Sequence, residues 1–199
     1  MDLTYKKWKF NAISMVTQKC YNTEGVLLFH KTGTGKTLTS MGIVKNLGKN
    51  FVIMCPKQIV YQWKNFYIEY YKKYLPKNYG IISLENYKKL EDIPSENTVL
   101  IIDESHKILE IFNKLNPIEQ KEFFEILFKF NKRILLTSTP FYKKPSSIGL
   151  LTYIVSKNIK LSPIDDLAFE KKFYKINKFH SFFKGWFLPI LTDFSNLVK

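Results

Sequence analysis

The chain has 199 residues, 45% of them hydrophobic and 16% aromatic, which is enough apolar material for one folded domain and excludes a disordered protein. Its formal net charge is +14, and Arg133 is the only arginine, so lysine supplies almost all of the positive charge. Such a surface attracts polyanions, although a coding bias that favours Lys, Asn, Ile, Tyr and Phe together explains the same composition, and charge alone leaves both interpretations open.

Membrane and metal-binding classes find little support in the sequence. No apolar run reaches the about 18 residues of a membrane span, and the first residues, "MDLTYKKWKF", lack the apolar core of a secretory signal. We therefore expect an intracellular protein without a membrane partner. Cys20 and Cys55 form no CxxC or Cys/His cluster, so we expect buried, reduced thiols.

Five short apolar runs, each flanked by polar or turn residues, predict five strands. They are "VLLF" (26–29), "FVIMC" (51–55), "GIIS" (80–83), "VLII" (99–102) and "RILLT" (133–137). Because the runs are continuous rather than alternating, the strands are expected to be buried on both faces of a sheet.

Helical patterns lie between these runs, over residues 36–47, 59–75 and 116–130. The second carries aromatic residues at helical spacing, which are expected to face the core or a partner: Trp63, Phe66, Tyr67, Tyr70 and Tyr74. The third opens with Asn116 as N-cap, Pro117 in the first turn and Glu119 at the capping-box position. Strands that alternate with helices predict an α/β fold with a parallel sheet flanked by helices on both faces.

The first strand is followed by "HKTGTGKT", which matches most of the phosphate-binding P-loop pattern. Gly33 and Gly35 let the backbone curl so that its amides point at phosphate oxygens, at the positive end of the next helix. Lys36 would reach the β and γ phosphates, and the Thr37 hydroxyl would bind Mg²⁺. His30 stands where the general pattern has a small residue. The predicted nucleotide-binding residues are Thr32, Gly33, Thr34, Gly35, Lys36 and Thr37.

The fourth strand is followed by "DESHK". Two adjacent carboxylates at a strand end are costly to bury without a cation, and a magnesium nucleotide supplies one. We expect Asp103 to hold Mg²⁺, directly or through water, and Glu104 to orient and deprotonate an attacking water. Together the two motifs predict binding of ATP with Mg²⁺, and Lys36, Asp103 and Glu104 are the predicted catalytic residues.

The fifth strand is followed by "STP", and this completes a series that resembles a known family. The segments "HKTGTGKT", "VIMCPKQIVYQW", "LIIDESHK" and "LLTSTP" resemble motifs I, Ia, II and III of superfamily 2 helicases and translocases, in order and at similar spacing. "CPKQIVYQW" and "LTSTPFYKKPSSIGLL" are similar to the Swi/Snf-like branch. "FHKTGTGKTLTS" is similar to relatives in large DNA viruses, the poxvirus-type nucleoside triphosphatases.

The resemblance implies a P-loop NTPase fold and a set of functional roles. Residues 1–155 would form the N-terminal RecA-like ATP-binding lobe, and 156–199 a helical, aromatic-rich extension toward a second lobe. His106 would couple the nucleotide state to Thr137, Ser138 and Thr139. Pro56 and Lys57 would lie along a nucleic-acid backbone, DNA rather than RNA. If the protein is viral, its location would be the host cytoplasm or the virion.

The chain departs from the family pattern at a few positions. Where relatives have a Tyr-Gln pair near the adenine, this chain has Phe10 and Asn11, so adenine selection by a side-chain amide is not expected. Lys143 replaces an Asn that follows motif III in Swi/Snf-type relatives. His180 lies outside every motif and is interpreted as structural.

The resemblance also implies a missing part. A superfamily 2 motor closes its ATP site between two lobes, and the second contributes arginine fingers, whereas Arg133 precedes the motif III strand. We therefore expect the 199-residue chain to bind Mg-ATP, to hydrolyse it slowly and to be unable to translocate. Strong nucleic-acid-stimulated ATPase activity of the purified chain would contradict this expectation.

The sequence is compatible with three functions. The first is the ATP-binding lobe of a nucleic-acid-dependent ATPase. The second is a non-catalytic nucleotide-binding subunit that docks in a transcription or packaging assembly, against which the intact Lys36, Asp103 and Glu104 count. The third, a small-molecule kinase, explains the P-loop but not "DESH" followed by "LLTSTP".

Overall fold

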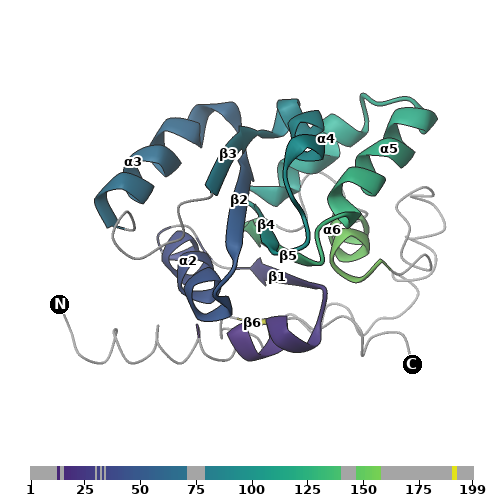
Figure 1. Cartoon of the computed structure of the whole chain (residues 1–199). Coiled ribbons are helices and arrows are strands. Elements are labelled where there is room, and N and C mark those ends of the chain that lie inside the picture. Colours follow the sequence, from purple (N-terminus) through teal and green to yellow (C-terminus); the bar gives the residue numbers. More distant parts are fainter. Residues whose placement is uncertain are drawn as a thin grey trace.

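A six-stranded sheet with the order β3-β2-β4-β5-β1-β6 lies at the centre of the computed structural model (Figure 1). The structure describes residues 13, 16–29, 31, 33, 35–70, 79–139, 147–157 and 190–191. Five strands run parallel: β1 (Gly25–Phe29), β2 (Asn50–Cys55), β3 (Tyr79–Ser83), β4 (Thr98–Ile102) and β5 (Lys132–Thr137). The five predicted strands are confirmed, each with the predicted last residue and a start one residue earlier.

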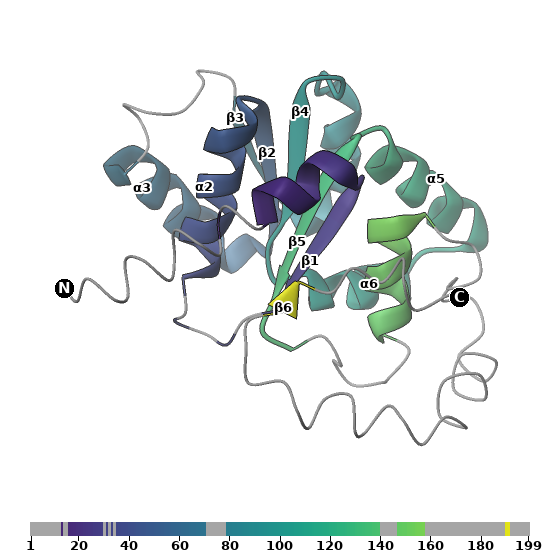
Figure 2. The same cartoon turned by 90° about the horizontal axis from the view of Figure 1, so that it is seen from below.

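Helices cover both faces of this sheet, as the sequence predicts (Figure 2). One face carries the helical segment 16–22, α2 (Lys36–Leu47) and α3 (Val60–Tyr70), which the 3₁₀ turn η1 (Lys57–Ile59) precedes. The other carries the 3₁₀ segment η2 (Leu84–Asp92), η3 (Ser105–Lys107), α4 (Ile108–Phe112), α5 (Pro117–Phe128) and α6 (Ser147–Ser156).

The core is divided into two clusters by the alternation of side chains along the strands. In β2, Val52 and Met54 pack toward α5 and α6, whereas Phe51 and Ile53 pack toward α2 and α3. Because both sets are fully buried, the continuous apolar runs in the sequence are explained by a sheet with no solvent-exposed face.

Local predictions for the helices also hold where the structure describes them. The Asn116 side chain accepts hydrogen bonds from the amides of Ile118 and Glu119, and the Glu119 carboxylate accepts one from the Asn116 amide, which completes the capping box. On α3, Trp63 and Tyr67 are buried in the core. The side chains of Tyr70 and Tyr74 lie outside the described part.

Both cysteines are unpaired and buried, as predicted. Burial raises the pKa of the Cys20 thiol and of the Cys55 thiol to about 12, so both remain protonated. Within the described ranges, no helix is long and apolar enough to cross a membrane.

A short strand, β6 (Ile190–Leu191), pairs antiparallel with β1 and was not predicted. Within the expected helical extension 156–199, the structure describes only 156–157 and this strand, so the proposed boundary between lobe and extension stays a prediction. The positions Phe10, Asn11, Lys143 and His180 lie outside the described residues.

The single arginine has a structural position at the end of the sheet opposite the predicted nucleotide site. Arg133, at the start of β5, is fully buried and donates hydrogen bonds to the carbonyl oxygens of Ile154 at 2.8 Å and of Phe130. It also donates to the Glu24 carboxylate at 3.1 Å. Since Ile154 is in the last turn of α6, the guanidinium satisfies a carbonyl that helix geometry leaves unpaired.

Replacing this arginine is expected to destabilise the fold. Arg133→Met leaves buried carbonyl groups without donors, which should lower the free energy of unfolding by about 3 kcal/mol. Glu24→Gln is the control, because Glu24 is about half exposed and exposed ion pairs contribute about 0–1 kcal/mol. Urea unfolding measures both changes, and equal midpoints for the two variants would contradict the structural role of Arg133.

Candidate nucleotide site

The carboxyl ends of the parallel strands meet at one edge of the sheet, and most of the predicted site residues follow these ends. Phe29, the last residue of β1, is the register partner of Thr137 at the end of β5. Ile102, the last residue of β4, is the register partner of Met54 in β2 and of Leu135 in β5. This register brings the segments after β1, β4 and β5 together, which is where parallel α/β sheets bind ligands.

The loop after β1 has the curled backbone that the glycines predict. Gly33 and Gly35 have φ values of 81° and 88°, in the left-handed region that glycine adopts without strain. Gly35 is the N-cap of α2 and gives no side-chain cap, and the first turn contains no acidic residue. The first amides of α2 therefore present their partial positive charge to the strand edge. His30, Thr32 and Thr34 lie outside the described residues.

Lys36, the first residue of α2, lies close enough to the acidic segment after β4 for its charge to act there. Burial is the largest influence on both groups: it raises the pKa of Asp103 and lowers the pKa of His106, and the charge of Lys36 is a smaller influence that acts to lower both. Together with the strand register, this places Lys36 and Asp103 at the same edge of the sheet. Thr37 follows on α2 and is half-buried.

Asp103 is held in a fixed orientation by two donors. Its Oδ2 atom accepts a hydrogen bond from Trp63 Nε1 at 2.9 Å, and Oδ1 accepts one from the Glu104 amide at 2.9 Å. The residue is only 7% exposed. Burial raises the pKa of this carboxyl group, whereas the two hydrogen bonds act in the opposite direction.

Glu104 adopts an unusual backbone conformation next to this carboxylate. Its φ of 48° lies in the left-handed region, which is uncommon for a residue other than glycine and is often found at functional sites. Its Oε2 atom lies 3.3 Å from Nδ1 of His106. Because a carboxylate only accepts, this contact favours the tautomer with the proton on Nδ1.

His106 connects the segment after β4 to the segment after β5. Its Nδ1 atom lies 3.1 Å from Oγ1 of Thr137, which is fully buried and also accepts a hydrogen bond from the Thr139 amide at 3.1 Å. Burial lowers the pKa of His106, so the ring is neutral at pH 7. The structure brings these predicted residues into contact, and Ser138 lies between the two threonines.

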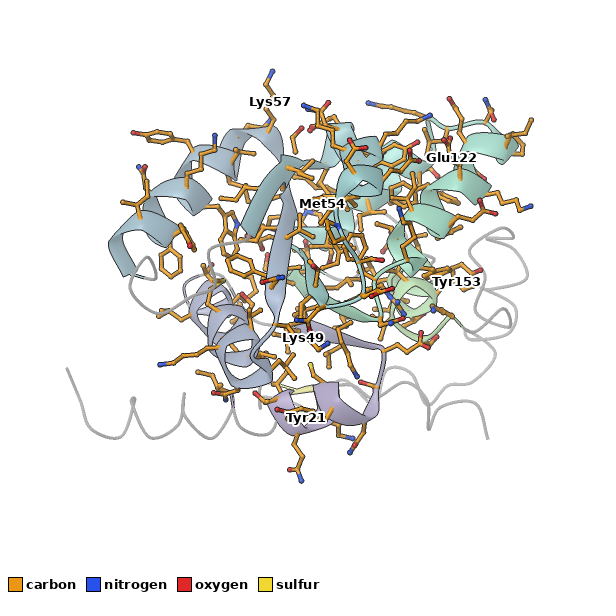
Figure 3. All side chains as sticks on the ribbon, in the orientation of Figure 1. Tyr21, Lys49, Met54, Lys57, Glu122 and Tyr153 are labelled. Carbon is orange, nitrogen blue, oxygen red and sulfur yellow. The ribbon has the colours of Figure 1, made fainter. Side chains whose placement is uncertain are left out.

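The two predicted nucleic-acid residues differ in exposure. Pro56 is buried, and its carbonyl oxygen accepts the Ile59 amide. Lys57 is exposed and points away from the protein at the carboxyl end of β2, whereas Lys49 precedes the strand at its other end (Figure 3). Lys57 is therefore the accessible member of this pair.

Sequence reasoning missed one residue of the site. Trp63 was expected to pack in its own lobe, and it does, but its indole N–H also orients Asp103. The tryptophan in "QW" predicted packing in the core but not a hydrogen bond to Asp103, because nothing in the sequence places α3 beside the end of β4. The strand order, in which β2 is the neighbour of β4, creates that contact.

Comparisons with known proteins agree with this geometry. Residues 3–142, more than half of the chain, match the family model described as type III restriction enzyme, res subunit. None of the curated protein sequences matches the chain.

Two solved structures share the fold. The SWI2/SNF2 ATPase core of Sulfolobus solfataricus in complex with dsDNA has a TM-score of 0.60 at 17% identity, over 84% of this chain and 38% of that chain. The same organism's SWI2/SNF2 ATPase core domain has a TM-score of 0.58 at 18% identity, over 84% and 37%. The chain thus spans less than two-fifths of these proteins. From the family match, the chain belongs to the type III restriction enzyme res subunit family, as an ATP-binding RecA-like lobe of the superfamily 2 helicase and translocase type.

Proposed function

We propose that this lobe binds Mg-ATP at the edge formed by the ends of β1, β4 and β5, and hydrolyses it in a nucleic-acid-dependent cycle once a second lobe completes the site. The observation that carries the proposal is that three motifs meet at one edge of the sheet. Lys36 opens the helix after β1, Asp103 follows β4, and His106 from the same segment as Asp103 contacts Thr137 at the end of β5. Lys36 and the amides of α2 would hold the phosphates.

The residues at this edge fit a magnesium ion. Asp103 offers a buried carboxylate whose two oxygens are already oriented by single donors, so further lone pairs remain for a cation. Across the described ranges, no group of three or more His, Cys, Asp or Glu could hold a metal by itself. Mg²⁺ fits this arrangement, because it commonly binds phosphate oxygens, water and one or two protein oxygens. Asp103 and Thr37 would be the protein ligands. When bound, the ion would neutralise charge on the phosphates.

Glu104 is proposed as the group that orients and deprotonates the attacking water. Its side chain is 29% exposed, so water can reach it, and the contact with His106 restrains its orientation. His106 would pass changes at Glu104 to Thr137 and, through the Thr139 amide, to the segment after β5. Ser138 and Thr139 would then carry the nucleotide state to the rest of the motor.

A second lobe, in the same chain or from a partner, is proposed because this chain has no arginine for the nucleotide. Its only arginine, Arg133, is buried among carbonyl groups at the start of β5. An arginine finger contributes about 10³- to 10⁵-fold in phosphoryl transfer, which corresponds to about 4–7 kcal/mol of barrier.

Nucleic acid is the proposed partner, DNA rather than RNA. The net charge of +14 and the exposed Lys57 support contacts to a phosphate backbone, which position a protein without reading sequence. One structure with the same fold is described in complex with dsDNA.

We propose further that the protein acts inside a cell and is of the large-DNA-virus kind, in which case it would be found in the host cytoplasm or the virion. The lysine-rich composition and the segment "FHKTGTGKTLTS" support this proposal. The alternative of a non-catalytic docking subunit is not favoured, because the described acids and Lys36 meet in one site.

Two substitutions should separate binding from hydrolysis. Lys36→Ala should abolish Mg-ATP binding, whereas Glu104→Gln should keep binding and lose turnover, because it keeps the size of the side chain but not its basicity. Lys45→Ala and Glu91→Gln are matched controls on exposed positions. Nucleotide binding and phosphate release are measured with and without duplex DNA, single-stranded DNA and RNA, and a Lys36→Ala variant that binds like wild type would contradict the proposal.

The isolated chain should hydrolyse ATP slowly even with saturating nucleic acid. Supplying a second lobe with its arginines should raise the rate by about 10³-fold or more. A steady-state phosphate-release assay measures both rates. High nucleic-acid-stimulated turnover by the chain alone would show that no second lobe is needed.

Trp63→Phe should weaken magnesium binding while the aromatic packing remains. Phenylalanine fills most of the indole site but donates no hydrogen bond to Asp103. Loss of such an orienting group commonly costs about 10- to 100-fold in metal affinity. The measurement is thermal stabilisation by ATP across a Mg²⁺ titration. A lower melting temperature without nucleotide, together with an unchanged Mg²⁺ midpoint, would mean that Trp63 is only a packing residue.

A further inference from the structure

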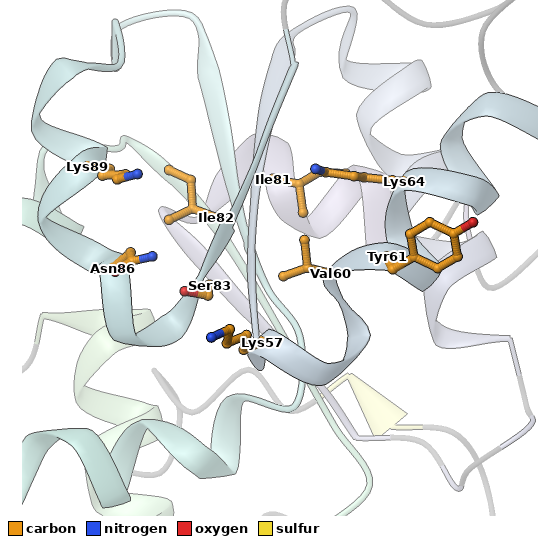
Figure 4. Close-up of a pocket in the computed structure, with 9 residues that line it drawn as sticks. All are labelled: Lys57, Val60, Tyr61, Lys64, Ile81, Ile82, Ser83, Asn86 and Lys89. Atoms are coloured by element: carbon orange, nitrogen blue, oxygen red, sulfur yellow. The ribbon is translucent and has the colours of Figure 1, made fainter.

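A hollow of about 410 Å³ lies beside the edge strand β3, apart from the nucleotide site (Figure 4). Its floor is formed by Val60, Ile81 and Ile82, and polar residues surround it. The described residues that line it are Lys57, Val60, Tyr61, Lys64, Ile81, Ile82, Ser83, Asn86 and Lys89, of which none is acidic.

Three lysines from three different elements converge on this hollow. Lys57 comes from η1, Lys64 from α3 and Lys89 from η2. Figure 4 shows the ammonium groups of Lys64 and Lys89 turned toward β3, with Lys57 near the end of the strand. All three are exposed, and within the described part of the chain none forms an ion pair. Like charges that gather without a counter-charge repel one another, so an anion is the ligand this hollow fits.

The remaining groups favour a nucleic-acid strand over a small anion. Tyr61 is 71% exposed at the rim, where its ring is accessible for stacking on a base. Ser83 and Asn86 provide hydroxyl and amide donors of the kind that contact phosphate and sugar. An apolar floor, an aromatic rim and several cations are also found together in the binding sites of proteins that bind single-stranded nucleic acid without sequence preference.

Lysines near an edge strand also have a simpler explanation, since they prevent strand pairing between molecules. Here, however, the lysines are not on β3 itself, which reads Tyr-Gly-Ile-Ile-Ser. They stand on the flanking helical elements, from which Lys64 and Lys89 point toward the strand from opposite sides (Figure 4). This placement leaves the hollow open and makes it cationic.

We propose that a single-stranded segment of the nucleic acid leaves the Lys57 contact and crosses the edge of β3, with its backbone held by Lys64 and Lys89 and one base stacked on Tyr61. The proposal rests on the proposed function, because it extends the nucleic-acid track of that function. The new surface lies outside the four sequence motifs except at Lys57, Val60 and Tyr61.

The test uses the whole 199-residue chain and a fluorescent 20-nucleotide oligothymidylate at several salt concentrations. Lys64→Gln with Lys89→Gln should remove two phosphate contacts and reduce the slope of log affinity against log salt by about 1.4. The control, Lys114→Gln with Lys121→Gln, changes the same charge at exposed positions, in the turn after α4 and in α5, and should leave most of the slope unchanged. Tyr61→Ala should weaken binding about 5-fold or more.

The outcomes separate this inference from the proposed function. If the two double variants bind alike while Lys57→Gln binds weakly, the track exists but does not cross β3, and the inference is wrong. If wild type is stabilised by Mg-ATP but binds no oligonucleotide, the nucleic-acid partner itself is wrong. If a 20-residue polyglutamate displaces the oligonucleotide at equal concentration, the hollow is a site for an acidic protein segment, which also overturns the inference.

Discussion

The carboxylate of Asp103 is the group on which the arrangement of the site depends. It follows a central strand and is 7% exposed, and its hydrogen-bond donors within the described part of the chain are the neutral N–H groups of Trp63 and Glu104. An ionised carboxylate in such a place is costly unless charge or hydrogen bonds compensate it. The Trp63 N–H, the Glu104 amide and the charge of Lys36 do so in part. A magnesium nucleotide would supply the remaining compensation for the buried charge of Asp103. This compensation is a physical reason for the site to bind Mg-ATP.

This constraint joins the fold to the proposed chemistry. Parallel strands place Lys36, Asp103 and Thr137 at one edge only because β4 lies beside β5 and β5 beside β1. The chain of contacts Glu104, His106, Thr137 and the Thr139 amide then runs along that edge. Under the proposed function, a change at the nucleotide would reach the segment after β5 through His106 and Thr137, which are buried and have few alternative positions.

Much of this could be predicted from the sequence, because the determinants are local. Continuous apolar runs indicate doubly buried strands, Asn116 and Glu119 indicate a capping box, and "GTGKT" indicates a loop of left-handed glycines. The rest depends on strand order. Trp63 and Asp103 are 40 residues apart and meet only because β2 neighbours β4. The position of Arg133 before the motif III strand already separated it from the nucleotide, but its carbonyl partner Ile154 on α6 could not be predicted. The two residues of β6 are too few for any pattern.

The most direct test of the account is calorimetric titration of ATP into the chain, with Mg²⁺ and with EDTA, for wild type and Asp103→Asn. If the phosphates are held jointly by the α2 loop and by an ion at Asp103, wild type will bind one nucleotide and lose affinity in EDTA, whereas Asp103→Asn will bind weakly in both. Equal affinity of wild type with and without Mg²⁺, unchanged in Asp103→Asn, would contradict the central claim.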